Sequence, residues 1–73
     1  MNLPDMIPVS SSNVTEIGYD ESTQTVFVRF LNGNLFIYKS VPIFEFEGLK
    51  NAPSIGSYLH RNYKNVYPYE RIE

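Results

Sequence analysis

The sequence predicts an α+β domain: a three-stranded antiparallel β-meander followed by two short α-helices and a C-terminal tail. The first observation is a pair of apolar, β-branched runs on either side of Asn32-Gly33. The second is a pair of prolines, Pro42 and Pro53: Pro42 suits the first turn of a helix, and the segment after Pro53 has apolar residues at helical spacing. The third is the length of 73 residues, which fits one domain. A small meander cannot bury its apolar face alone, so we expect the helices to cover it.

Residues 1–12 form the first segment, and they contain two prolines and a run of serines. This composition predicts an irregular N-terminal arm. The first strand is expected from Val14 to Tyr19, before the polar turn 20–24. If this turn has a four-residue loop, Ile17 faces the core and Glu16 lies across from Arg29 as an opposite-charge pair.

The second and third strands are expected at 25–31 and 34–39. Because Asn32 and Gly33 both tolerate positive φ, they predict a two-residue type I′ hairpin, which sets the register of the pair. In this register one face is the core side and carries Val26, Val28, Phe30, Leu35 and Ile37. The opposite face carries Phe27, Arg29, Phe36 and Tyr38.

The helices follow directly. The first is expected from Pro42 to Lys50, because proline suits the first turn of a helix. Ser54 is a good N-cap for a second helix that extends to about Lys64. Residues 65–73 form a proline-interrupted tail that we expect to pack on the body of the domain through Val66, Tyr67 or Ile72.

The composition argues against catalysis and against metal or cofactor binding. There is no cysteine and a single histidine, His60, so neither a thiolate metal site nor a catalytic relay is indicated. Phosphate-loop and dinucleotide-binding motifs are also absent from the sequence. We therefore expect no enzyme, no metal and no cofactor. No apolar run approaches the ~20 residues of a membrane span, which predicts a cytoplasmic protein without a membrane partner.

Two surfaces are candidates for ligand binding. On the outer sheet face, Arg29 and Tyr38 would combine a cation with a ring on which a base can stack. The alternative is that the N-terminal arm, the tail or a second subunit covers this face. On the second helix, polar side chains follow i, i+3, i+4, i+7 spacing and could meet phosphate groups, although an ordinary solvated helix face shows the same pattern. These are Ser57, His60, Arg61 and Lys64.

Aromatic residues exceed what so small a core needs. Phe27 and Phe36 fall on the outer sheet face, and Phe44 falls outside the apolar stripe of the first helix. These three residues are the predicted interface with a protein partner. They support an alternative function, a homo-oligomeric interaction protein that binds and blocks a host protein.

The segments 28–42 and 52–69 resemble the KTSC domain, which is named for its occurrence at the C-terminus of some lysyl-tRNA synthetases. Its aromatic-x-aromatic motif falls on Phe36-Ile37-Tyr38, with Phe in place of the usual Tyr, and the resemblance covers residues 7–72. The other matching motifs are Val41-Pro42, Ser54-Ile55-Gly56 and Tyr67. An RNA-binding role has been suggested for the family.

This resemblance implies a single stand-alone domain, 1–73, of bacterial or phage type, in the cytoplasm of a bacterium or of an infected cell. Formal net charge is −2, which argues against binding through bulk charge. We therefore expect a non-enzymatic domain that binds a phosphate-bearing ligand locally, either RNA or a small nucleotide.

Overall fold

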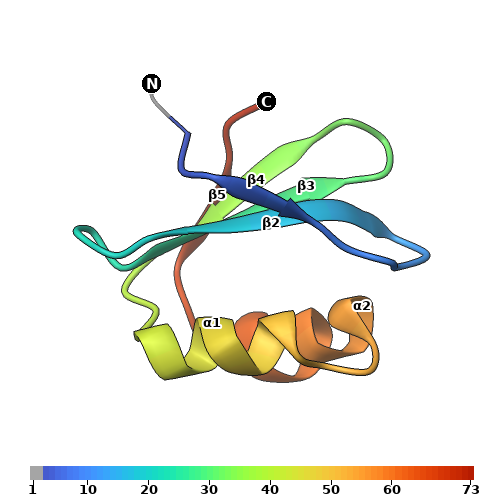
Figure 1. Cartoon of the computed structure of the whole chain (residues 1–73). Helices are drawn as coiled ribbons and strands as arrows, with labels where there is room; N and C mark the ends of the chain where they lie inside the picture. Colours follow the sequence, from blue (N-terminus) through green and yellow to red (C-terminus); the bar gives the residue numbers. More distant parts are fainter. Residues whose placement is uncertain (1–2) are drawn as a thin grey trace.

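The computed structural model describes residues 3–73, in which a five-stranded antiparallel sheet is covered on one face by helices (Figure 1). Along the sheet the strands follow chain order: β1 (Met6–Pro8), β2 (Val14–Asp20), β3 (Thr25–Phe30), β4 (Leu35–Tyr38) and β5 (Tyr69–Arg71). The helices are α1 (Ile43–Lys50), α2 (Ile55–Tyr58) and the π-helix η1 (Leu59–Tyr63). Within residues 3–73, no helix is long and apolar enough to cross a membrane.

The prediction of three strands was wrong because the arm and the tail each add one. In the arm, Met6 of β1 pairs with Gly18 of β2. In the tail, Arg71 of β5 pairs with Phe36 of β4. A bare meander leaves the backbone groups of its two edge strands without partners, and these short additions satisfy them. Strands of three residues beside prolines carry almost no local sequence signal.

The predicted type I′ turn was also wrong. The loop has three residues, Leu31 to Gly33, because the Phe30 N–H donates to the Asn34 carbonyl at 2.9 Å and the Gly33 N–H donates to the Phe30 carbonyl at 2.9 Å. Gly33 has φ 91°, which is the conformation that closes a three-residue loop through a glycine bulge. As a result, Val28 pairs with Phe36 and not with Ile37.

This one-residue shift exchanges the two faces of β4. Tyr38 joins the core between the sheet and the helices, and Phe36 packs against that core. Leu35 and Ile37, predicted as core residues of the helix side, lie on the outer face with Phe27. The predicted core-facing residues are therefore confirmed for β3 and wrong for β4.

The β2–β3 register is confirmed. Asp20 pairs with Thr25, and the loop between them has four residues. In this register Ile17 pairs with Val28 and Glu16 pairs with Arg29. A bulge between Val14 and Glu16 changes the alternation of the strand. Val14 and Ile17 are therefore both almost completely buried in the same core, although they are three residues apart.

Helix α1 confirms the expected first helix, and it buries Phe46 and Leu49 against the sheet. Phe46 stacks on Tyr19 with ring centroids 5.1 Å apart. Tyr38 meets Tyr63 edge to face at 5.3 Å, which locks the end of β4 to η1.

The outer sheet face is covered by the N-terminal arm and the C-terminal tail, which was the expected alternative to an exposed face that binds a ligand. Phe27 lies across from Gly18 and is 5% exposed. The prediction that Phe27 contacts a protein partner was therefore wrong. A Cβ on Gly18 would lie 2.5 Å from Met6 Sδ and 3.1 Å from Pro4 Cγ, so a larger residue here would force the arm to shift. The tail reaches the same face, where Glu73 Oε1 lies 2.6 Å from Arg29 Nη1.

Glu45 joins α1 to the rest of the helical layer through three tyrosines. The Tyr58 hydroxyl donates to Glu45 Oε1 at 2.7 Å, and the Tyr67 hydroxyl donates to Oε2 at 3.2 Å. The Tyr63 hydroxyl donates to the Glu45 carbonyl oxygen at 3.0 Å. Burial raises the pKa of Tyr63 and Tyr67, and the Glu45 hydrogen bond raises the pKa of Tyr58.

Gly33 provides a direct test of the turn. Nothing lies near the position of its Cβ, so Gly33→Ala adds only the cost of positive φ, about 1 to 2 kcal/mol of unfolding free energy in urea titration. Gly33→Asn should cost less, because asparagine tolerates positive φ. Equal losses for the two variants would contradict the assigned turn.

The tyrosine cluster predicts loss of stability at alkaline pH. A tyrosine ionises near pH 10 in the unfolded chain, whereas the native pKa of Tyr58, Tyr63 and Tyr67 is raised. The unfolding free energy should therefore be constant below about pH 9 and fall above pH 10, by up to about 1.4 kcal/mol per pH unit for each tyrosine. Urea titrations between pH 8 and 11 measure this fall. Glu45→Gln should make it shallower, and an unchanged fall would contradict the role of the carboxylate.

Candidate functional site

The second helix ends in a π turn that the sequence did not predict. Its start is as expected, since the Ser54 hydroxyl accepts from the Ser57 N–H at 3.3 Å. In η1, however, the Lys64 N–H donates to the Leu59 carbonyl at 2.9 Å, five residues back. Lys64 then leaves the helix in an extended conformation. Such π turns are rare in proteins, and those that occur are frequently found at functional sites.

Three neighbouring hollows lie at one end of the domain, and residues of this turn line two of them. At that end, the β3–β4 hairpin and the start of β2 lie above α2 (Figure 1). The amide hollow, about 490 Å³, is lined by Asn13, Phe30, Leu31, Asn32, Asn34 and Phe36. The tyrosine hollow, about 260 Å³, is lined by Phe30, Tyr38, Leu59, His60, Lys64 and Tyr69. The serine hollow, about 430 Å³, is lined by Ser12, Asn13, Ser54, Gly56, Ser57, His60 and Arg61.

Each pair of hollows shares one wall residue. Phe30 lies between the amide and tyrosine hollows. His60 lies between the tyrosine and serine hollows. Asn13 lies between the serine and amide hollows. The three hollows are therefore neighbours at this end of the domain, and we refer to the three together as the depression.

The depression is locally basic although the whole chain is acidic. In the part of the chain that the structure describes, the residues that line the three hollows include Arg61, Lys64 and His60 but no Asp or Glu. Neither Arg61 nor Lys64 forms an ion pair within residues 3–73. The charges of these two side chains are thus available to an anion.

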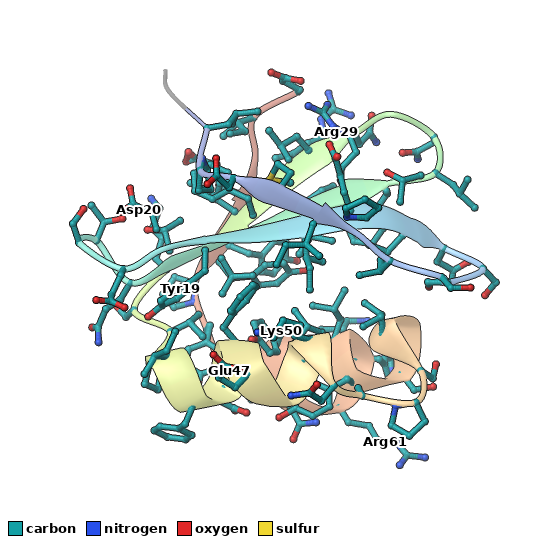
Figure 2. The ribbon with its side chains drawn as sticks, in the orientation of Figure 1. Tyr19, Asp20, Arg29, Glu47, Lys50 and Arg61 are labelled. Carbon is teal, nitrogen blue, oxygen red and sulfur yellow. The ribbon has the colours of Figure 1, made fainter. Side chains whose placement is uncertain are left out.

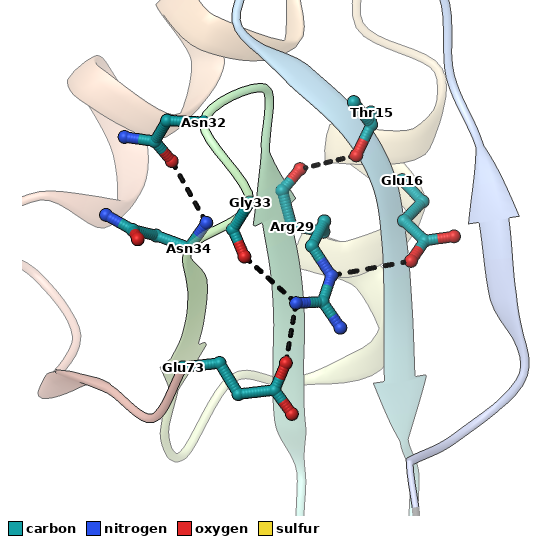
Figure 3. Close-up of polar contacts among 7 residues, drawn as sticks. All are labelled: Thr15, Glu16, Arg29, Asn32, Gly33, Asn34 and Glu73. Carbon is teal, nitrogen blue, oxygen red and sulfur yellow. Dashed lines mark hydrogen bonds and ion pairs between the residues drawn. The ribbon is translucent and has the colours of Figure 1, made fainter.

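Arg29, Lys39 and Lys50 are paired with acids, whereas Arg71 of β5 forms no ion pair within residues 3–73 and lines none of the three hollows. Arg29 Nη1 lies 2.6 Å from Glu73 Oε1, and Arg29 Nε lies 3.7 Å from Glu16 Oε2 (Figure 3). Lys50 lies 3.1 Å from Glu47, and both are labelled on α1 in Figure 2. Glu73 contributes most to the raised pKa of Arg29.

Arg29 and Tyr38, predicted to share the outer face, are on opposite faces of the sheet because of the register of β4. Arg29 Nη1 also donates to the Gly33 carbonyl at 3.0 Å, so this guanidinium braces the hairpin (Figure 3). Tyr38 is 8% exposed and lines the tyrosine hollow with His60 and Lys64. The structure thereby brings Tyr38 of the predicted sheet site together with His60 and Lys64 of the predicted helix site.

The four polar residues predicted to lie on one face of the second helix line two different hollows. Ser57, His60 and Arg61 line the serine hollow. Lys64 lies beyond the π turn and lines the tyrosine hollow, where it shares the wall with His60. Regular α-helical spacing finds the first three residues together, but it cannot account for the extra residue in the last turn.

The predicted partner residues have three different environments. Phe27 is buried under the arm. Phe36 is half-buried on the helix side, edge to face with Phe30 at 5.3 Å. Only Phe44 is widely accessible among these three residues, with 71% of its surface exposed, as its position on the first helix predicted.

Sequence reasoning missed the asparagines and Tyr69. Asn13, Asn32 and Asn34 look like ordinary turn residues, and only the folded chain brings them to one hollow. Tyr69 belongs to β5, where it is 54% exposed and packs 5.8 Å from Tyr38 and 6.2 Å from Phe36. Its position follows from the pairing of β5 with β4, which has no local signature.

The architecture defines a small α+β domain, and the depression is a basic surface at one end of it. Residues 10–67 match the KTSC domain model, and the chain belongs to the KTSC domain family. A KTSC domain protein from Yersinia pestis has the same fold, with a TM-score of 0.90 and 26% identity, over 94% of this chain and 97% of that one.

Relatives include both long and short proteins. A lysine-tRNA ligase of Trichormus variabilis is 34% identical over 67 residues, which are 92% of this chain and 12% of the ligase. The chain thus spans about one eighth of the length of that relative. An uncharacterized protein of Stutzerimonas stutzeri is 32% identical over 92% of this chain and 96% of its own length.

Proposed function

We propose that this KTSC domain is a non-enzymatic module that binds a phosphate-bearing ligand, single-stranded RNA in the first place, in the depression at the end of the sandwich. The observation that carries the proposal is the meeting of three hollows around Phe30, His60 and Asn13, with two unpaired cations and no acid in their walls within residues 3–73.

The two kinds of group that single-stranded RNA requires are both present. Arg61 supplies a planar guanidinium and Lys64 an ammonium, which bind phosphate oxygens through charge-assisted hydrogen bonds. The Ser57 hydroxyl lies in the same hollow as Arg61. Tyr69 offers an accessible ring beside Lys64, and aromatic rings stack on unpaired bases without regard to sequence.

Relatives favour RNA over other phosphate ligands. The names of the lysine-tRNA ligases state a tRNA substrate, and those proteins contain a segment similar to this domain. Net charge of −2 means that binding depends on the local cations and not on the field of the whole chain.

Removal of the two cations should weaken RNA binding and its salt dependence together. For single strands the slope of log K against log salt is about 0.7 for each phosphate neutralised. Arg61→Ala combined with Lys64→Ala should therefore reduce the slope by about 1.4 and lower the affinity for an RNA hexamer at low salt. Fluorescence anisotropy at a series of salt concentrations measures both quantities.

The matched control is Lys50→Ala, which removes a cation of α1 that pairs with Glu47 and lines none of the three hollows. This variant should keep the wild-type slope. Equal slopes for wild type and the double variant would reject the proposed site. Binding of a mononucleotide with the same affinity as the hexamer would identify a small nucleotide as the ligand.

A second candidate function, self-association or capture of a host protein by a phage-type protein, is favoured by one observation. Phe44 is 71% exposed and its neighbour Ile43 is 43% exposed at the start of α1. Exposed aromatic side chains of this kind are enriched at protein interfaces.

Sedimentation tests the self-associating form of this candidate. The wild-type protein should sediment above its monomer mass of 8.5 kDa at high concentration. Phe44→Ser should return it to the monomer, while Lys50→Ala on the same helix should not. A wild-type monomer at every concentration would count against self-association and leave capture of another protein as the remaining form.

A further inference from the structure

We infer that the RNA strand leaves the depression along β5, on the side of this strand that faces the helices, and that Arg71 binds one of its phosphates. The inference rests on the proposed function and adds to it a third cation and a path for the ligand. Arg71 is outside the walls of the three hollows, so its role follows from its place in the sheet.

The pairing of β5 with β4 determines which way the β5 side chains point. Phe36 pairs with Arg71, and Tyr38 pairs with Tyr69. Paired residues of antiparallel strands lie on the same face of a sheet. Tyr38 belongs to the core on the helix side, and Phe36 packs against that core. Arg71 and Tyr69 are therefore on the helix side as well, whereas Glu70 between them is on the outer face.

Strand β5 is open to a ligand. It lies at the edge of the sheet, and its three residues are all exposed. The Ile72 N–H donates to the Leu35 carbonyl at 2.8 Å. Because hydrogen-bonded positions alternate along an antiparallel strand, the main-chain N–H groups of Tyr69 and Arg71 point away from β4. A phosphate at this edge can therefore accept from the main chain as well as from the guanidinium.

The charge of Arg71 is available to an anion. Arg71 forms no ion pair within residues 3–73. The preceding acid, Glu70, is on the opposite face and lies 3.9 Å from Lys39 Nζ. The following acid, Glu73, lies 2.6 Å from Arg29 Nη1. The acids on both sides of Arg71 in the sequence are thus paired with other cations.

Tyr69 connects Arg71 to the depression. Its ring lies 5.8 Å from that of Tyr38 and 6.2 Å from that of Phe36, by ring centroids, and Tyr69 lines the tyrosine hollow with Lys64. Residues two apart on a strand are about 7 Å apart, which is close to the spacing of neighbouring phosphates in an extended RNA strand. A base stacked on Tyr69 would therefore lie between two cations, one in the hollow and one further along β5.

The composition of β5 favours RNA over a protein strand as the occupant of this edge. Three residues give a protein strand few main-chain hydrogen bonds, and very short edge strands protect a sheet from such pairing. A ring and a guanidinium at alternate positions supply the stacking and the charge that single-stranded RNA requires.

The test compares two variants in salt titrations of a labelled RNA hexamer, followed by fluorescence anisotropy. Arg71→Ala should reduce the slope of log K against log salt by about 0.7, the value for one phosphate of a single strand. The matched control Lys39→Ala removes the same charge from the outer face of the same strand pair, and it should keep the wild-type slope. Arg71→Lys retains the charge and should also keep the slope.

A second pair of variants tests the ring. Tyr69→Leu should lower the affinity for the hexamer about tenfold, because one stacked base is lost, and it should leave the salt slope unchanged. Tyr69→Phe keeps the ring and should bind within about twofold of wild type, since stacking does not need the hydroxyl. The comparison of Arg71 with Lys39 is independent of this pair.

Three results would overturn the inference. A wild-type slope for Arg71→Ala, together with a reduced slope for the Arg61→Ala and Lys64→Ala double variant, would remove the path along β5 and leave the proposed function intact. Equal reductions for Arg71→Ala and Lys39→Ala would show an effect of total charge and not of a site on β5. Absence of hexamer binding by the wild-type protein would remove the path and the proposed function together.

Discussion

The pairing register of β3 and β4 is the constraint on which the rest of the structure depends. Gly33 closes a three-residue loop, and the resulting register turns Tyr38 and Phe36 toward the helices. With Tyr38 inside, η1 has a ring against which Tyr63 packs. With Phe36 inside, the hairpin contributes an aromatic wall to the depression. A shift of one residue would send both rings to the opposite face and abolish that wall.

The same register decides how the outer face is closed. Phe27 and Leu35 are apolar residues on a face that a meander would expose, and β1, Pro4 and the tail cover them. Small domains without disulfides need most of their residues to stabilise the fold. Here the two ends of the described chain serve this purpose as edge strands.

The sequence was sufficient for features that are local. The four-residue turn after Asp20 correctly places Ile17 and the Glu16–Arg29 pair, and Pro42 marks the start of α1. Asn32-Gly33 misled because the dipeptide suits two loop lengths, and the choice between them depends on which ring the core can bury. The candidate site shows the same division: helical spacing identifies Arg61, whereas Asn13 and Tyr69 reach the depression only through strand pairing.

The π turn of η1 behaves as a single inserted residue, and this has a consequence for how such a surface can diversify. Leu59 and Tyr63, at its two ends, are both buried, so the insertion leaves the apolar contacts with the sheet in place. Lys64, directly after the turn, has moved from the helical row to another wall of the depression. Gain or loss of one residue here would move a cation by a fraction of a turn without disturbing the core, which would allow the proposed ligand surface to vary independently of the fold.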